Sequence, residues 1–287
     1  MAYGDIPEAI RQRLASNRVR MYHGLWHFVR NENEWNNMDP AVRELLIEQG
    51  WKAPRFENQP GSGIDFLYMH RQMIAMVNAW GAEDNNPDGG HGGHGGHGGH
   101  GHHSNKKDIV IPWLDIPWDH NDPVWPMPQV TNPDPNIFGP TKEQETTNTA
   151  LQRVNERYAN RTWLRTVTLD SFGNELERGI HGWMHMHWST EPPANPNNLD
   201  ISNDWLGSPF SSHINKHFWK LHGWIDNRIA AWEDANGVEA DLTQGWDGPP
   251  DYVTGEPHSA SPELFSLLNF AERKPLLMPW KGLLLEK

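Results

Sequence analysis

Histidines spaced four residues apart place the strongest constraint on how this chain can fold. Three such pairs occur: His23 and His27, His181 and His185, and His213 and His217. Residues i and i+4 share one face of an α-helix, so both imidazoles of a pair can point at one metal ion. His70 stands alone in an apolar segment as a further candidate. The pattern predicts helices that carry metal ligands. Histidines that cap helices or pack against tryptophan are the alternative left open by spacing alone.

Composition limits the chemistry of such a site. The 287 residues include 17 His and 16 Trp but no Cys, which excludes disulfides, thiolate catalysis, iron–sulfur clusters and cysteine-based zinc sites. An all-imidazole site suits copper or zinc and excludes calcium and magnesium, which prefer oxygen ligands. A metalloprotease HExxH motif is absent, because Gly182 follows His181 and Gly24 follows His23.

The charge balance and hydropathy exclude two classes of partner. Lys and Arg number 24 against 37 Asp and Glu, a net charge of −13, which argues against nucleic-acid binding. No window approaches the ~20 apolar residues of a bilayer span, so no membrane partner is expected. Residues 1–13 lack a basic-then-apolar signal region. We therefore expect a cytoplasmic location, and export together with a carrier protein stays open.

Apolar spacing and end signals predict a mainly α-helical fold. The expected helices cover residues 6–30 (with one slip in the spacing near Asn17), 40–49, 65–80, 141–161, 174–187 and 212–235. Asp39 should cap the second helix and Gly50 end it, while Asp65 is the expected N-cap of the third. Thr141 should open the fourth, with Gln144 as its capping-box partner. Residues 109–140 lack a helical period and are predicted to be ordered but irregular chain.

Two segments fall outside this helical pattern. Residues 84–107 hold a Gly-His repeat, Gly89 to His103, which cannot pack a core. We expect it either to capture copper weakly and deliver it to buried ligands, or to be a neutral repeat expansion. The predicted organisation is one domain over residues 1–240 and a Pro/Gly-punctuated C-terminal extension, 241–287, packed on or near the core.

Four segments resemble motifs of the tyrosinase, catechol oxidase and hemocyanin superfamily. In the family's order they are FLYMHR (66–71), IVIPWLD (109–115), HGWMHMHWS (181–189) and FWKLHGWIDNRIAAW (218–232). The last is the most specific, because Phe218 stands four residues before His222, Asp226 four after it and Trp232 ten after it. The resemblance implies a central four-helix bundle that houses a dicopper site, with two copper ions as cofactors and long irregular loops.

The resemblance also implies roles for individual residues at the second copper, copper B. The implied ligands are His181, His185 and His222. Phe218 would hold the ring of His222 in place, and Asp226 would orient that ring or tie down neighbouring backbone. Ordinary helix packing and capping is the alternative for both. We expect Arg71 to form a structural ion pair.

The first copper, copper A, departs from the family's pattern. His70 in FLYMHR and His23 in YHGLWH match family ligands, but the loop that normally supplies another histidine reads NQPGSGID here. His27 shares a helix face with His23 and is the natural substitute, and His120 is the runner-up. The remaining histidines near the motifs are expected to be structural: His187, His213 and His217.

The function implied by the resemblance is oxidation of a phenolic, o-diphenolic or o-aminophenolic substrate with dioxygen, by a copper oxidase or monooxygenase. Gly182 occupies a position where family monooxygenases often carry Asn, which favours o-diphenols or o-aminophenols over tyrosine. Two alternatives stay open: a non-enzymatic dioxygen- or copper-binding protein, and a His-ligated zinc or nickel protein. The expected partners are a small aromatic substrate and dioxygen. A copper chaperone or a second copy of the chain stays open.

Overall fold

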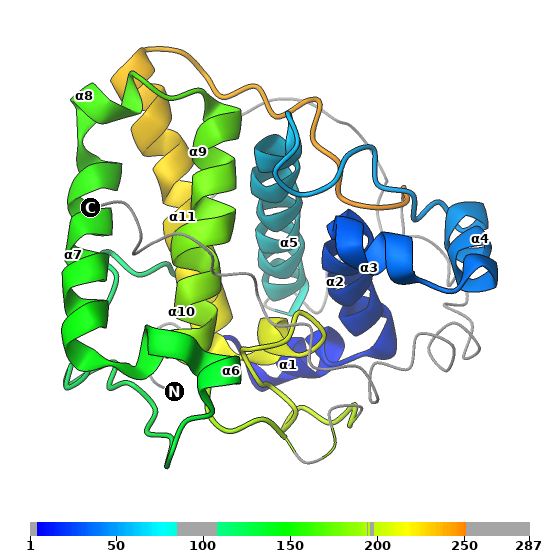
Figure 1. Cartoon of the computed structure of the whole chain (residues 1–287), viewed down its shortest axis with the longest axis horizontal. Coiled ribbons are helices and arrows are strands. Elements are labelled where there is room, and N and C mark those ends of the chain that lie inside the picture. The colour runs from blue at the N-terminus through cyan, green and yellow to red at the C-terminus, as the bar shows by residue number, and fades with distance from the viewer. Residues whose placement is uncertain (1–4, 85–107, 194, 196–197, 251–287) are drawn as a thin grey trace.

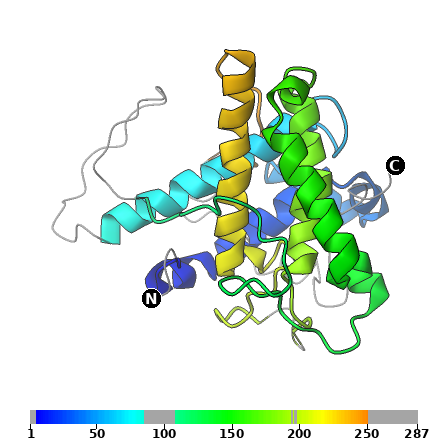
Figure 2. The same cartoon turned by 90° about the vertical axis from the view of Figure 1, so that its left-hand side faces the viewer.

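The computed structural model describes residues 5–84, 108–193, 195 and 198–250. Within these ranges the protein is mainly helical and contains no β-strand (Figures 1 and 2). The Gly-His repeat and residues 251–287 of the predicted extension lie outside the described residues. Among the described helices, none combines the length and apolar character that a membrane crossing requires.

The helical elements follow one another along the chain with irregular connections. The N-terminal half contains α1 (Glu8–Leu14), α2 (Asn17–Arg30), α3 (Glu32–Asn37), α4 (Pro40–Glu48) and α5 (Ser62–Asp84). After the irregular segment come α6 (Pro135–Phe138), the 3₁₀ turn η1 (Gly139–Lys142), α7 (Gln144–Ala159) and α8 (Arg161–Leu164). The last group is α9 (Leu169–Leu176), the π turn η2 (Glu177–His181), α10 (Gly182–His187), the 3₁₀ turn η3 (Ser212–Ile214) and α11 (Lys216–Asn236).

The core lies where α2, α5, the α9–α10 helix and α11 meet. Figure 1 shows α5 between α2 and α9, and α5 packs against both α9 and α11. Aromatic side chains from these helices are fully buried there, among them Trp26, Phe66, Trp183, Trp219 and Trp224. Burial of such large rings is the main favourable term in holding the helices together.

The crossing of α5 and α9 is unusually close. A methyl group on Gly63 would overlap the backbone of Asp170 and Asn174, and one on Gly173 would overlap the backbone of Gly63. The Asp170 carboxylate accepts hydrogen bonds from the backbone N–H groups of Gly61 and Gly63, both at 2.8 Å. Asp65 was predicted to cap this helix, and that prediction is wrong. The helix begins earlier, at Ser62, and its first N–H groups are satisfied by α9.

Several predicted helix ends also differ from the structure. The helix predicted over residues 6–30 is two helices, because Ser16 interrupts it and caps α2 through the N–H of Val19. Thr141 does not open α7. It lies in η1 and its hydroxyl donates to the Phe138 carbonyl instead. The predicted cap of α4 is confirmed, since Asp39 accepts from the N–H of Ala41 at 2.8 Å.

The helices predicted over residues 174–187 and 212–235 begin at other residues in the structure, and the first also changes its helix type. The first begins at Leu169, where Thr168 accepts from the N–H of Ser171, and changes from α to π geometry at Glu177. A single π turn within an α-helix often marks a functional site. The second is preceded by a 3₁₀ turn and begins at Lys216, with Asn215 as its cap.

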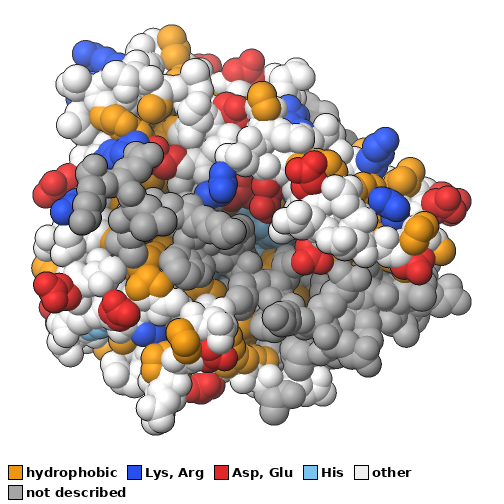
Figure 3. Space-filling view, in the orientation of Figure 1, with side chains coloured by type: hydrophobic (Ala, Val, Ile, Leu, Met, Phe, Trp, Pro, Cys, Tyr) orange, Lys and Arg blue, Asp and Glu red, His pale blue; other side chains and the backbone are white. Residues whose placement is uncertain are grey.

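The described beginning of the predicted C-terminal extension packs onto α2 and α5. The indole N–H of Trp26 donates to the carbonyl of Trp246 at 3.1 Å, and the N–H of Trp246 donates to Asp65 at 2.9 Å. Asp65 also forms an ion pair with Arg55 at 2.9 Å. The surface seen in Figure 3 carries acidic and basic side chains interspersed with uncharged ones.

Candidate metal centre

Four structural elements bring six histidines into one buried group, which we call the histidine cluster. Its members are His23 and His27 from α2, His70 from α5, His181 and His185 from the η2–α10 segment, and His222 from α11. Each of the six is at most 3% exposed. All six were predicted as ligands from the sequence, and the fold places them side by side.

One half of the cluster, which we call half A, consists of His23, His27 and His70. Their metal-binding nitrogens all lie within 4.8 Å of one another. The ring centres of His23 and His27 are 4.9 Å apart, and each lies 5.8 Å from that of His70. His120, the other candidate for this half, is absent from the group.

The other half, half B, consists of His181, His185 and His222. The ring centre of His181 lies 4.5 Å from that of His185 and 5.0 Å from that of His222, and the last two are 5.4 Å apart. The halves touch, because His70 stacks on His222 at 4.5 Å. The group on this side whose nitrogens all lie within 4.8 Å of one another joins His181 and His222 with His70, and His185 is not part of it.

Backbone carbonyls fix the orientation of four of the rings. The Nδ1–H of His70 donates to Phe66 at 2.9 Å, and that of His181 to Glu177 at 3.3 Å. Those of His185 and His222 donate to Leu206 at 2.8 Å and Phe218 at 2.7 Å. A carbonyl only accepts, so each Nδ1 carries the proton and each Nε2 carries the lone pair that a metal needs.

His23 reaches the same state through another histidine. The Nε2 of His213 lies 3.1 Å from the carbonyl of Leu14, so His213 donates there. Its Nδ1 lies 3.1 Å from the Nδ1 of His23, and the backbone of Pro209 is a further hydrogen-bond partner of the His213 ring. A neutral His213 ring has one N–H group, and in the tautomer that donates to Leu14 its Nδ1 accepts from the Nδ1–H of His23, which leaves the His23 Nε2 lone pair free. His213, expected to be structural, orients a member of the cluster.

The Nε2 atoms of all six rings are buried and have no hydrogen-bond partner within the described part of the chain. Burial lowers the pKa of His70 to about 3 and of His185 to about 4, and places those of the other four well below 6.5. The neighbouring imidazoles add to this shift for five of the six, because they would repel a second positive charge. The cluster is thus a set of neutral imidazoles. Unpaired buried polar atoms are costly, and a metal ion would satisfy them.

His27 differs from the other five because neither of its ring nitrogens has a hydrogen-bond partner in the described chain. Carboxylate oxygens of Glu57 and Glu177 lie within 4.8 Å of one of these nitrogens and of each other. Arg30 binds Glu177 through two contacts, at 2.6 and 3.1 Å, inside the protein. Burial and the charge of Glu177 raise the pKa of Glu57 to about 7.

Aromatic and charged contacts support the rings from outside. Phe218 stacks on His222 with ring centres 3.7 Å apart, in agreement with the role expected for it. Phe66 contacts both His70 and His181. Asp226 does not bond to His222. It pairs with Arg71 at 2.7 Å and thereby links α11 to α5, which confirms that Arg71 forms an ion pair.

The remaining described histidines lie outside the cluster. His120 lies beside His187, 5.0 Å between ring centres, and His187 donates to the carbonyl of Thr141 at 2.6 Å. His217 stacks on Trp188 at 4.6 Å and contacts the Asn215 side chain. His258 falls in the part of the chain that the structure leaves undescribed.

Sequence reasoning missed two residues that act on the cluster. His213 was expected to be structural. Its contact with His23 joins positions 190 residues apart, so no local spacing could have indicated it. Glu57 lies in an irregular segment, where the hydrogen bond from its N–H to the carbonyl of Arg30 at 2.8 Å places it. Neither helical period nor motif could have indicated it.

No protein-family model matches the chain, and no curated protein matches it significantly. The functional argument therefore depends on the residues and geometry of the histidine cluster.

Proposed function

We propose that this protein is a dicopper oxidoreductase of the tyrosinase, catechol oxidase and hemocyanin type. Copper A would be held by His23, His27 and His70, and copper B by His181, His185 and His222. In this proposal α2, α5, the α9–α10 helix and α11 are the four helices of the bundle. The convergence of six buried, neutral Nε2 atoms without partners supports it most directly.

The donor set fits copper better than other common ions. Imidazole binds Cu, Zn, Ni and Fe, whereas Mg and Ca need oxygen. Three imidazoles for each of two ions match the two touching halves of the cluster. A bound copper pair would supply redox chemistry, since each ion can exchange one electron and the pair two. The protein's part is to keep the imidazoles neutral, to fix every ring but that of His27 through Nδ1 and to exclude water from the site.

An o-diphenol or o-aminophenol is the substrate class that we assign. Oxidation of two o-diphenols to o-quinones releases four electrons and four protons, which reduce one dioxygen to two waters. Because the dioxygen takes up all four protons, the overall reaction needs no other proton acceptor. Gly182 follows His181 with no polar side chain to act on a monophenol, which is why tyrosine is the poorer substrate in this proposal.

Metal content and turnover test the proposal together. The chain would be freed of metal, reloaded with Cu(I) under nitrogen, dialysed and measured for copper, beside a variant lacking residues 89–103 so that the Gly-His repeat is not counted. We expect two coppers per variant chain, a near-ultraviolet band on admission of dioxygen, and oxidation of 4-methylcatechol much faster than of tyrosine. One copper per folded chain would contradict the proposal.

Burial of all six rings favours a second candidate, a protein that binds dioxygen or copper without turning over a substrate. It predicts the same copper content and the same absorption band, but a band that disappears reversibly under vacuum and no catechol oxidation. A zinc or nickel protein, the remaining alternative, predicts neither the band nor turnover. Metal analysis of protein purified without added metal separates it from both copper candidates.

A further inference from the structure

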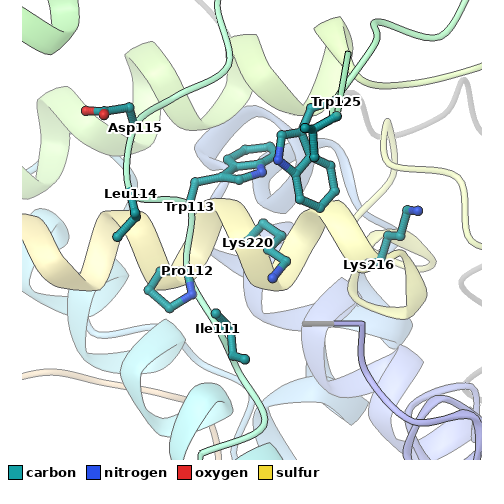
Figure 4. Close-up of a pocket in the computed structure, with 9 residues that line it drawn as sticks. Ile111, Pro112, Trp113, Leu114, Asp115, Trp125, Lys216 and Lys220 are labelled. Atoms are coloured by element: carbon teal, nitrogen blue, oxygen red, sulfur yellow. The ribbon is translucent and has the colours of Figure 1, made fainter. Parts of the chain in front are cut away.

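A surface pocket of about 360 Å³ lies against α11, between this helix and the segment that contains Pro112 and Trp113 (Figure 4). Lys220, in its wall, is two residues from His222, about 200° around the helix, so the pocket and the histidine cluster occupy different faces. Its volume falls within the range typical of small-molecule sites. None of the six cluster histidines lines it.

The segment that forms one wall is fixed to the helix. The N–H of Trp113 donates to the carbonyl of Lys220 at 3.2 Å. Gly223 lets Pro112 approach closely, because a methyl group at Gly223 would lie 2.9 Å from the Pro112 side chain. The wall is therefore held in place before any ligand arrives, which reduces the entropy lost on binding.

Aromatic and apolar side chains form most of the pocket lining. The rings of Trp113 and Trp125 meet edge to face, 5.9 Å between centres. At the rim Leu114 is 89% exposed and Val124 70% exposed. Large apolar side chains gathered and left in water at the mouth of a pocket are typical of a binding site.

Two lysines give the same pocket a positive charge. The ammonium groups of Lys216 and Lys220 lie 5.9 and 5.7 Å from the centre of the Trp125 ring. Neither forms an ion pair with any described residue, and Asp5 acts on Lys220 only from beyond ion-pair distance. Asp115 also lines the pocket, but its carboxylate is directed away from both lysines (Figure 4).

We propose that this pocket binds a small aromatic carboxylate, with the ring against Trp113 and Trp125 and the carboxylate at Lys216 and Lys220. The indoles offer ring faces and edges for stacking, and the unpaired ammonium groups offer the charge-assisted hydrogen bonds that a carboxylate accepts. The site is independent of the dicopper proposal, because it shares none of the cluster's side chains.

The test uses the full chain after metal removal, so that no metal ion can hold a carboxylate. Binding of 4-fluorophenylacetate is followed by fluorine NMR, with neutral 4-fluorophenylacetamide as the matched ligand. We expect the acid to bind about tenfold more tightly than the amide. Lys216→Gln/Lys220→Gln should remove that preference, whereas Lys52→Gln, at an exposed lysine outside the pocket, should keep it.

A further variant tests the position of the ligand. Leu114→Glu adds a carboxylate at the rim without changing the core, and should weaken binding of the acid while circular dichroism stays unchanged. No binding of the acid, equal binding of acid and amide, or unchanged preference in the double lysine variant would each overturn the proposal.

Discussion

Half B of the histidine cluster takes the orientation of all three of its rings from backbone carbonyls, whereas in half A only His70 does so. His181 and His222 donate to carbonyls four residues earlier in their own helices. His23 depends on His213, whereas neither ring nitrogen of His27 has a hydrogen-bond partner in the described chain. Carboxylate oxygens of Glu57 and Glu177 lie within 4.8 Å of one His27 nitrogen. A carbonyl four residues back is present in every helix. His181 and His222 can therefore be specified by short motifs, whereas His185 needs the loop carbonyl of Leu206 and His23 needs His213. The resemblance to the family departs in half A.

Loss of His222 should have the largest effect, because it removes a proposed copper B ligand whose ring its own helix holds in place. We expect His222→Ala to bind one copper instead of two and to oxidise catechol at least about a hundredfold more slowly. Loss of a residue that only orients a metal ligand already lowers metal affinity or activity about 10- to 100-fold. Copper analysis and catechol oxidation measure both effects.

The matched control is His217→Ala, on the same helix but stacked on Trp188. It should keep two coppers and most of the activity. If His217→Ala were the more damaging change, half B would be assigned to the wrong histidine.

The next largest effect should distinguish the two candidates for half A. His27→Ala should lose one copper and most of the oxidation, because His27 lies with His23 and His70. His120→Ala should keep both coppers, because His120 lies beside His187. Two coppers per chain in His27→Ala would show that His27 is not a ligand.

A smaller effect tests whether half A depends on a side chain for its orientation. His213→Leu removes the acceptor of the His23 Nδ1–H and should weaken copper A about 10- to 100-fold while leaving copper B unchanged. Competition with a copper chelator, followed for each of the two ions, gives both affinities. Equal weakening of both sites would indicate general loosening of the fold instead.

The smallest effect concerns pH and the metal-free protein. Burial holds the pKa of His70 near 3 and that of His185 near 4, below the ordinary 6.5 that applies once the chain unfolds. Between pH 6.5 and 4 these histidines bind more protons in the unfolded chain, so their contribution to the free energy of unfolding falls as pH falls. Each such histidine contributes at most about 1.4 kcal/mol per pH unit.

Urea titrations of metal-free protein at several pH values measure this slope. Above pH 6.5 the contribution of these histidines should be constant. His185→Phe, which removes one of these groups, should flatten the curve. Glu57 and Asp65 act in the opposite direction, because burial raises their pKa values to about 7 and about 6, so the informative quantity is the difference between the two proteins. The same pH dependence in His185→Phe as in the unaltered chain would contradict the buried, neutral state of His185.

The sequence predicted the mainly helical fold and the six members of the cluster because both follow from local spacing and short motifs. The helix start at Asp39 was predicted for the same reason, since its cap lies two residues from its partner. Asp65 and Thr141 are residue types that commonly cap helices, but tertiary contacts override this local preference. Asp170 satisfies the start of α5 from another helix, and Thr141 belongs to a 3₁₀ turn.

What could not be predicted are the contacts between distant parts of the chain. The carbonyl of Leu206 that orients His185 lies in an irregular loop. The charge pair of Arg30 and Glu177 joins positions 147 residues apart. Neither has a periodic or compositional signature, because each depends on how helices cross and not on how they form.

The π turn between α9 and α10 has a consequence for how such a chain can change over generations. It holds one residue more than an α-helix of the same path, while α9 is locked to α5 by Gly63, Gly173 and Asp170. Deletion of a single codon in this turn would leave the α5–α9 contact unchanged. It would rotate α10, and His185 with it, by about 100° away from the other histidines. A lineage could thus lose the centre, or regain it, by a one-residue change in length, without replacing any histidine.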